Sequence, residues 1–403
     1  MSVRIAAFTM SDPNHFSGLH SVTAELLGAG AEVKVWTHTR FQTQLEAIGA
    51  GFADIFRDRP LDAVDDTSRP LPSRFVTFAA VHARAIIAEV ASCRPDLVLY
   101  DGFALIGRLV AEALDVPAII VTSGHAIDAR MFRERLAEDP RVHTDARCLA
   151  AVERLKSEFN IADASPFSYV ADPSPWLNVH IEPEQWLTED EKRRLGPMAY
   201  FGSLSGAAMA KPSRASRGGA APRLYVSFGT IVWRYWTAEA LSALAAIAEG
   251  IGRVPGAGAV ITLGGADVPQ DVVASLARPG VSVVPFADQW ATLSTSDIFI
   301  THQGIGSTHE AVALGVPMLS YPFFWDQPAL AARAQEFGLA LPLLAGRVGP
   351  DNALTADAVE AGIAAIEAKR LSMEPAFAEA RRWEEGAVAN RPAIALRIIA
   401  LAR

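Results

Sequence analysis

Several features that assign a chain to a common protein class are scarce or missing here. Only two of the 403 residues are cysteines, Cys93 and Cys148, which are too few for a disulfide framework and lack the spacing of a metal site. No apolar run reaches the about 20 residues that a membrane-spanning helix needs, and the first residues form no basic and then hydrophobic leader. We therefore expect a cytoplasmic protein without integral membrane association, whose cysteines are ordinary buried thiols.

Concentrated charge and three catalytic motifs are also missing. The formal net charge is −9, and no run of lysine and arginine forms the basic patch that nucleic acid requires. The chain lacks the G-x-S-x-G of serine hydrolases, the lysine of a P-loop, and an Asp-x-Asp pair that would hold a metal ion against a diphosphate. These absences argue against nucleic-acid binding and serine hydrolysis, and they imply neither a metal ion nor a cofactor.

What the sequence does have is an alternation of short apolar runs with helical segments. In the first half we expect strands at residues 3–8, 32–37, 95–101 and 117–122, and helices at residues 19–27 and 79–91. In the second half we expect strands at residues 223–228, 259–263, 281–285, 298–301 and 317–321. Strands that alternate with helices predict an α/β fold with doubly wound parallel sheets.

A change of composition divides the chain. Residues 205–222 are small, polar and unpatterned, which is typical of a linker between domains. We therefore predict an amino-terminal domain at residues 1–204 and a carboxyl-terminal domain at residues 223–374. Residues 375–403 follow as an amphipathic helical segment.

The stretch of residues 301–310 predicts an anion site. It follows an apolar strand and opens a helix, and its backbone N–H groups and hydroxyls lie where the helix dipole favours an anion. The residues expected to contact that anion are His302, Gly304, Gly306, Ser307 and Thr308. His309 stands where the third glycine of G-x-G-x-x-G would be, so neither common nucleotide fingerprint fits. The segment is suited to hold a diphosphate.

This pattern resembles the nucleotide-sugar signature of family 1 glycosyltransferases, which glycosylate natural products such as macrolides. The family signature runs aromatic-x-P-Q, a hydrophobic strand, H-x-G-x-x-S-x-x-E, G-V-P and a closing D/E-Q. Over residues 286–327 the chain keeps this spacing without gaps, reading Phe286-Ala-Asp-Gln289, His302-x-Gly304-x-x-Ser307-x-x-Glu310, Gly315-Val-Pro317 and Asp326-Gln327. The alternative is a glycine-rich turn of any doubly wound domain.

The resemblance implies the GT-B architecture, in which two Rossmann-like doubly wound domains face each other across a cleft. The last segment, residues 375–403, would cross back to the amino-terminal domain. The implied enzyme is an inverting hexosyltransferase that moves glucose from UDP-glucose, as co-substrate, onto a hydroxyl of a small, mainly apolar acceptor. Residues 74–82 and 124–176 would partly wall the acceptor site, in a monomer or homodimer.

The resemblance also assigns roles in the nucleotide-sugar site. Phe286 would stack on the uracil, the backbone of Ala287 and the side chain of Gln289 would read the base or ribose, and Glu310 would accept both ribose hydroxyls. His302, Ser307 and Thr308 would hold the diphosphate, and Asp326 and Gln327 would hold the sugar. The rest of the nucleotide-sugar site would be lined by Ser227, Gly229 and Thr230. These last three alternatively form a buried strand that ends in a glycine turn. The family usually has Trp at position 286 and Pro at position 288, so UDP and dTDP both stay open as carriers.

Transfer to a hydroxyl also needs a base. The family places its catalytic histidine in the loop after the first strand, as G-H-x-x-P, and His15 holds that place. Asn14 and Gly18 replace the family's Gly and Pro. His20 is the rival base, although we expect it one turn into the following helix, packed or facing solvent.

Asp101 matches the family's carboxylate partner of that histidine, at the end of the strand expected at residues 95–101. A carboxylate there would fix the tautomer and stabilise the imidazolium. Its alternative role is to cap the helix at residues 104–113. Two other functions stay open, a non-catalytic protein that binds a nucleotide sugar and a related nucleotide-sugar epimerase, and the linkage could be to O, N, S or C.

Overall fold

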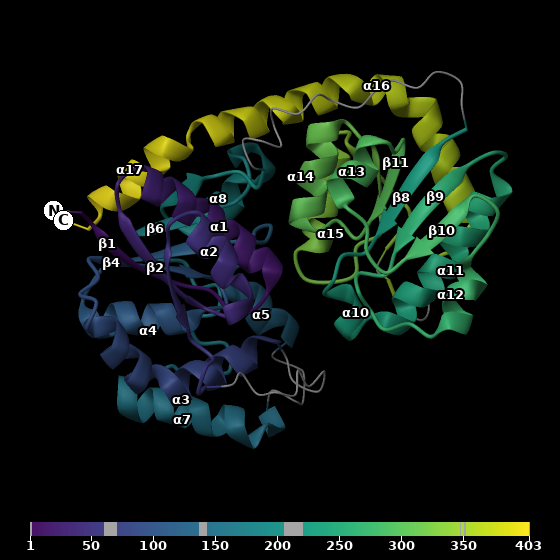
Figure 1. Ribbon diagram of the computed structural model, residues 1–403. Coiled ribbons are helices and arrows are strands. Elements are labelled where there is room, and N and C mark those ends of the chain that lie inside the picture. The colour runs from purple at the N-terminus through teal and green to yellow at the C-terminus, as the bar shows by residue number, and fades with distance from the viewer. Residues whose placement is uncertain are drawn as a thin grey trace. The chain divides into compact units, whose positions relative to one another are not determined.

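The computed structural model describes residues 2–59, 71–136, 143–204, 221–346, 348–349 and 352–402. The chain forms two compact units, one of residues Met1–Gly202 with Ala387–Arg403 and one of residues Ser203–Gly386 (Figure 1). Residues 205–220 of the predicted linker lie outside the described residues. The boundary predicted between residues 374 and 375 falls inside one long helix, α16 (Ala356–Ala389), which contains Pro375.

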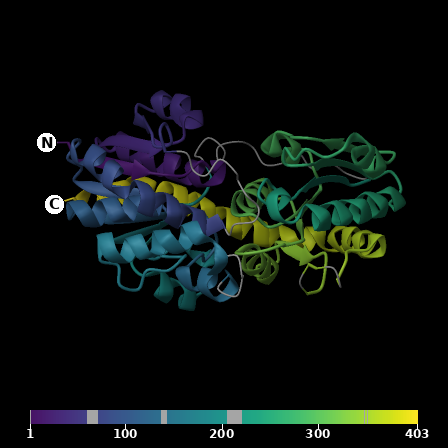
Figure 2. The same cartoon turned by 90° about the horizontal axis from the view of Figure 1, so that it is seen from below.

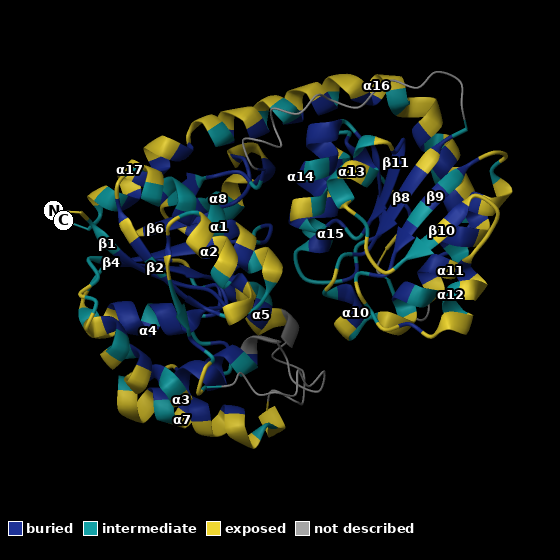
Figure 3. Ribbon diagram, in the orientation of Figure 1, coloured by how far each residue is buried: buried dark blue, intermediate teal, exposed yellow. Residues whose placement is uncertain are grey.

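The amino-terminal unit is built on a sheet of seven parallel strands in the order β3-β2-β1-β4-β5-β6-β7. Its strands are β1 (Arg4–Phe8), β2 (Glu32–Thr37), β3 (Gly51–Asp54), β4 (Leu97–Asp101), β5 (Ala118–Thr122), β6 (Leu177–His180) and β7 (Met198–Tyr200). Every residue of β4 and β5 is buried, because helices cover both faces of a parallel sheet (Figure 3). The sequences of these central strands are therefore almost continuously apolar.

Ten helical segments complete the described part of this unit. They are α1 (Pro13–Gly28), η1 (Thr39–Phe41), α2 (Gln42–Ala47), α3 (Leu71–Ala91), α4 (Leu105–Leu114), α5 (Ala129–Leu136), α7 (Ala146–Phe159), η2 (Glu184–Trp186), α8 (Glu189–Leu195) and α17 (Arg391–Ala400). The last of these packs against α1, and Figures 1 and 2 both place the two chain ends at the same end of this unit. Arg391 of α17 donates to the backbone oxygens of Phe201 and Gly202, both at 2.8 Å.

The carboxyl-terminal unit repeats the arrangement with six parallel strands in the order β10-β9-β8-β11-β12-β13. The strands are β8 (Arg223–Ser227), β9 (Gly258–Thr262), β10 (Val281–Val284), β11 (Ile298–Thr301), β12 (Met318–Ser320) and β13 (Ala340–Pro342). The helices are α10 (Val232–Tyr235), α11 (Thr237–Arg253), α12 (Gln270–Leu276), α13 (Gln289–Ser294), α14 (Ile305–Leu314), α15 (Gln327–Glu336) and α16. None of the described helices of either unit combines the length and apolarity that crossing a bilayer requires.

The predicted α/β class with doubly wound parallel sheets is confirmed, and every strand that the sequence predicted is present to within two residues at either end. Four strands were missed. They are β3, β6, β7 and β13, of which all but β6 lie at a sheet edge.

Candidate functional site

Both sheets reverse their strand order at one point, and the predicted site residues gather there. In the amino-terminal unit β1 pairs with both β2 and β4, and in the carboxyl-terminal unit β8 pairs with both β9 and β11. Ligands of open α/β sheets bind outside the carboxyl ends of the strands at such reversals. His15 and Asp101 follow β1 and end β4, whereas Ser227 and His302 end β8 and follow β11.

The structure brings His15 and Asp101 together. The Nδ1 of His15 lies 3.1 Å from Asp101 Oδ1, and because a carboxylate only accepts, Nδ1 carries the proton and donates. The His15 ring also contacts the ring of Phe103, with 4.5 Å between centroids. The side chain of His15 is 16% exposed and that of Asp101 is fully buried. This arrangement turns Nε2 of His15 into the nitrogen that can accept a proton.

Asp101 is held ionised by its hydrogen bonds. Burial alone raises its pKa, but the bond from His15, that residue's charge and the backbone N–H of Phe103 together bring the pKa below its usual range. The carboxylate accepts from Phe103 N at 2.8 Å and from Met10 N at 3.1 Å. The helix after it, α4, begins instead at an N-cap of Ala104 that makes no side-chain bond. The capping role considered for Asp101 is therefore wrong.

One feature predicted for His15 is also wrong, because the residue does not lie in a loop. It belongs to the first turn of α1, which starts at Pro13 with Asp12 as its cap. Gly18, which replaces the family's proline, lies close to Ser123, since a Cβ on Gly18 would come within 2.7 Å of Ser123 Oγ. His20 lies farther along α1, with Nε2 3.3 Å from the backbone oxygen of Gln44.

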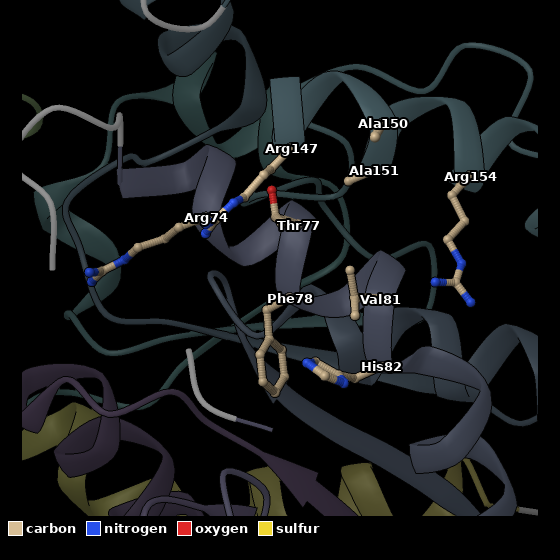
Figure 4. Close-up of a pocket in the computed structure, with 9 residues that line it drawn as sticks. All are labelled: Arg74, Thr77, Phe78, Val81, His82, Arg147, Ala150, Ala151 and Arg154. Atoms are coloured by element: carbon tan, nitrogen blue, oxygen red, sulfur yellow. The ribbon is translucent and has the colours of Figure 1, made fainter. Parts of the chain in front are cut away.

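The segment predicted to wall the acceptor site lines a hollow of about 510 Å³ between α3 and α7, called here the α3–α7 pocket (Figure 4). Its described lining is Arg74, Thr77, Phe78, Val81, His82, Arg147, Ala150, Ala151 and Arg154. A stack of rings leads from α3 towards the His–Asp pair. Phe75, one turn before Phe78, stacks on Phe103 at 5.4 Å, and Phe103 contacts His15.

In the carboxyl-terminal unit, His302 is packed between two glycines. A Cβ on Gly229 would lie 2.8 Å from the His302 ring, and a Cβ on Gly304 would lie 2.4 Å from its Nε2. Both glycines therefore make room for the imidazole, a reason that the sequence did not reveal. Burial lowers the pKa of His302 to about 4, against a smaller opposing effect of the Ser227 backbone. His302 is consequently neutral at pH 7.

Gln289, Ser307 and Glu310 form a polar cluster beside the first turn of α14. Gln289 Nε2 donates to Glu310 Oε2 at 2.8 Å and to Ser307 Oγ at 3.1 Å. Burial raises the pKa of Glu310, the bond from Gln289 lowers it, and the charge of Asp288 raises it further, with a net upward shift. The side chain of Gln289 thus orients Glu310 in this structure. Asp288, in place of the family's proline, caps α13 by accepting from Ala291 N at 3.0 Å.

Thr308 does not face a ligand site. It is fully buried, and its hydroxyl donates to the Gly304 oxygen at 2.9 Å and accepts from Gln303 Nε2 at 3.2 Å. Gln303, which the sequence did not single out, is buried with a left-handed φ of 65° and also accepts from Ser320 Oγ at 2.8 Å. A strained buried residue beside a helix start indicates a constrained loop. Thr308 and Gln303 therefore shape the loop between β11 and α14.

Phe286 forms an exposed platform. The residue is 64% exposed, and a Cβ on Gly265 would lie 2.4 Å from Phe286 Cζ. The tip of the ring thus lies close to the backbone of Gly265, whose φ is +78°. Ala287, beside it, is half-buried. The remaining predicted positions of this unit are open at the surface: Gly306 and Thr230 are both exposed.

Asp326 and Gln327, which were predicted to contact the sugar, have structural roles of their own. Gln327 is 6% exposed, and its Oε1 accepts from the backbone N–H groups of Phe323 at 2.9 Å and Phe324 at 3.3 Å. Gln327 therefore closes its own loop through Oε1. Asp326 is the N-cap of α15, and Trp325 before it has a left-handed φ of 53°. Within the described residues, no group of three or more His, Cys, Asp or Glu is arranged to hold a metal ion.

Comparison with known proteins supports the motif analysis. Residues 259–389 match the family of the erythromycin biosynthesis protein CIII-like C-terminal domain. The NDP-glycosyltransferase YjiC of Bacillus subtilis is 26% identical over 278 residues, which are 68% of this chain and 64% of that protein. The oleandomycin glycosyltransferase of Streptomyces antibioticus is 24% identical over 62% of this chain and 56% of its own length. The aligned part of the chain thus spans less than two thirds of these relatives.

Solved structures share the whole fold. The glycosyltransferase of kitacinnamycin superposes with a TM-score of 0.78 at 20% identity over 100% of both chains. The calicheamicin glycosyltransferase CalG4 gives 0.72 at 21% identity, over 100% of this chain and 98% of that one. At these identities the likeness establishes the fold alone, which is GT-B. The family resemblance and the fold predicted from the sequence are both confirmed.

Proposed function

We propose that this chain, which has the GT-B fold, is a natural-product glycosyltransferase, and that it is an inverting enzyme that transfers glucose from UDP-glucose to a hydroxyl of a small, mainly apolar acceptor. The observation that carries the proposal is the His15–Asp101 pair at the sheet reversal of the amino-terminal unit. A half-buried imidazole backed by an ionised, buried carboxylate is suited to remove a proton from a neutral alcohol.

The reaction is a single displacement. The acceptor oxygen attacks C1 of the sugar, a new C–O bond forms, and the bond from C1 to the diphosphate breaks with its electron pair leaving on UDP. His15 Nε2 takes the acceptor proton, and the adjacent Asp101 carboxylate stabilises the imidazolium that results. Attack opposite to the leaving group inverts the configuration at C1.

The leaving diphosphate would be stabilised at the start of α14. The first N–H groups of a helix have no partner within it and point along the positive end of its dipole. Ser307 adds a hydroxyl, and neutral His302 adds one N–H donor in place of a positive charge. Glu310, oriented by Gln289, would accept from the ribose hydroxyls. We propose that this set suffices without a metal ion.

The carrier could instead be dTDP, because the Phe286 platform can stack on any pyrimidine. One solved neighbour with the same fold, VinC, was crystallised with dTDP. Glu310 favours UDP in our proposal, since uridine offers two ribose hydroxyls and thymidine one. The comparison of both carriers is therefore part of the test.

The test is turnover of UDP-glucose and dTDP-glucose with a panel of aglycones, read by mass for one added hexose. We expect transfer from UDP-glucose, loss of that transfer in the His15→Ala variant, and UDP binding by calorimetry that survives a chelator. A wild-type protein that binds UDP but transfers to no acceptor would support a non-catalytic nucleotide-sugar-binding role instead.

A further inference from the structure

Phe103 contacts both members of the His15–Asp101 pair, and it does so through two different groups. Its backbone N–H donates to Asp101 Oδ1 at 2.8 Å, and the same oxygen lies 3.1 Å from Nδ1 of His15. Its ring lies against the imidazole of His15, with 4.5 Å between the centroids and 42° between the planes. One residue therefore determines part of the surroundings of both side chains.

The Phe103 ring is itself held in place. Phe75 of α3 stacks on it with 5.4 Å between the centroids, and Phe132 of α5 meets it edge-on at 5.6 Å. All three rings are buried. The turn that carries Phe103 follows β4 directly and is closed by the N–H of Ala104, which donates to the Asp101 backbone oxygen at 2.9 Å. The imidazole therefore meets a close-packed surface that cannot easily move aside.

This contact has two physical consequences for His15. The hydrogen bond to Asp101 fixes only the Nδ1 side of the imidazole, and a ring packed against the imidazole restricts its rotation about that bond. An aromatic ring also attracts a cation that lies within about 6 Å of its centroid. His15 gains a positive charge when it takes the acceptor proton, so this attraction grows as the reaction proceeds. An interaction that is stronger in the transition state than in the ground state speeds the chemical step.

We propose that Phe103 is a positioning residue of the base. Its ring keeps Nε2 of His15 in one orientation and stabilises the imidazolium that forms during transfer. This inference rests on the proposed function, because His15 is the base of that reaction. Phe103 acts through His15 and exchanges no proton of its own.

Phe103→Leu removes the ring and keeps the backbone N–H that donates to Asp101. The acceptors are 2-phenylethanol, a neutral alcohol, and 4-nitrophenol, which is largely ionised in mildly alkaline buffer and needs no base. With the full-length chain and UDP-glucose, kcat for the alcohol should fall about 3- to 30-fold, with KM within about twofold of the wild-type value. The kcat for 4-nitrophenol should change less than about twofold. Equal losses of kcat for the two acceptors would overturn the proposal. Phe103→Met, whose flexible side chain fills irregular gaps, is the second variant if the leucine protein folds poorly.

Phe41→Leu is the matched control. Phe41 is 5% exposed and Phe103 is 4% exposed. The Phe41 ring stacks on Phe16, which follows His15 on α1, with 3.9 Å between the centroids. This substitution loosens the packing of α1 and leaves the Phe103 ring in place. The ratio of kcat for the two acceptors should keep its wild-type value. A ratio that changes as much in Phe41→Leu as in Phe103→Leu would mean that looser packing of α1, and no property of the Phe103 ring, causes the effect.

NMR of the histidine rings separates this inference from the proposed function. It follows the protonation of His15 in the ligand-free chain, with the His15 signal assigned through His15→Gln, and needs neither nucleotide sugar nor acceptor. Asp101, the charged group that the structure places against His15, is the same in wild type and variants. Because Phe103→Leu removes the ring that favours the imidazolium, His15 should titrate at a pH lower by at least about half a unit. In Phe41→Leu it should titrate as in the wild type.

The two measurements give distinct outcomes. Absence of transfer to every acceptor, together with the shifted titration in Phe103→Leu alone, would refute the enzyme function and keep the role of Phe103 beside His15. An unchanged titration in Phe103→Leu, or an equal shift in Phe41→Leu, would refute the role of Phe103 whether or not transfer occurs.

Discussion

The two units share the strand order around their sheet reversals, and each places a histidine there. In the amino-terminal unit β3-β2-β1-β4 surround the reversal, and in the carboxyl-terminal unit β10-β9-β8-β11 do so. His15 donates to a buried, ionised carboxylate, whereas His302 lies between the backbones of Gly229 and Gly304. The same side chain at corresponding places in two similar sheets therefore meets opposite surroundings.

This difference determines what each imidazole can do. Asp101 keeps a proton on Nδ1 of His15 and stabilises a second proton on Nε2, which is what a base needs. Burial without a compensating charge holds the pKa of His302 at about 4, so that ring stays neutral and can only donate or accept a hydrogen bond. The sheet topology determines where each histidine lies, and its neighbours determine which protonation states it can adopt.

The largest effect should come from removing the base. His15→Ala is expected to lower kcat for an aliphatic alcohol by on the order of 10²–10⁴-fold, because the neutral alcohol then loses its proton acceptor. UDP affinity, measured by calorimetry, should be unchanged, since the proposed nucleotide site belongs to the other unit. An acidic acceptor that is already ionised near neutral pH should lose far less.

His20→Ala is the matched control on the same helix and should stay active. A wild-type rate for His15→Ala combined with an inactive His20→Ala would move the base to His20. Asp101→Asn should also slow transfer, and its melting temperature must be compared, because Asp101 also accepts from the backbone of Met10 and Phe103.

The next prediction separates two roles of Gln327, a contact with the sugar and the hydrogen bonds to its own loop. Gln327→Glu keeps an acceptor oxygen for the Phe323 and Phe324 N–H groups but replaces the amide donor. The activation free energy of transfer should rise by about 1–3 kcal/mol, which slows transfer, while UDP affinity stays within about twofold of the wild-type value. Gln327→Ala removes the loop bonds as well and should weaken both. Equal losses of transfer and UDP affinity in Gln327→Glu would show that this residue serves only its loop.

A smaller effect should appear at the stacking platform. Gly265→Ala would push a Cβ into the Phe286 ring and tilt it, and we expect about tenfold weaker UDP binding, within the about 1–3 kcal/mol of one base stack. Gly338→Ala is the control for backbone strain, since its φ is +71° and its nearest neighbour is 3.8 Å away. If Gly265→Ala weakens UDP binding by the same factor in the Phe286→Ala variant as in the wild type, then the substitution does not act through the Phe286 ring.

The two regions also differ in how much the sequence revealed. Apart from Ser227, Gly229 and Thr230, the residues predicted for the nucleotide-sugar site lie within one continuous stretch, residues 286–327, so their spacing could be matched directly to a motif. The His15–Asp101 pair spans 86 residues and was found only through the family resemblance. The α3–α7 pocket is formed by the packing of two helices, which no local pattern encodes. The strands β3, β7 and β13 are short and lie at sheet edges, where fewer apolar residues are required.

Local spacing also could not show which polar groups are already used. Thr308 has the same place in the motif as a ligand-binding hydroxyl, yet Gln303 and the Gly304 oxygen take that hydroxyl. Gln289 was expected at the base or ribose, and in the structure it binds Glu310 and Ser307. Side-chain partners depend on the fold around the motif, so these roles emerged only from the structure.

The smallest expected effect concerns the neutral state of His302. Its pKa is about 4 in the folded protein and about 6.5 when unfolded, so between these values the unfolded chain binds more protons and stability rises with pH. Acidification from pH 7 to pH 5 should therefore destabilise the wild type more than His302→Gln, by about 2–4 °C in melting temperature. His20→Gln, which changes a histidine of α1, is the control and should follow the wild type. Parallel pH profiles for wild type and His302→Gln would mean that His302 is not held neutral, and the contrast between the two histidines would fail.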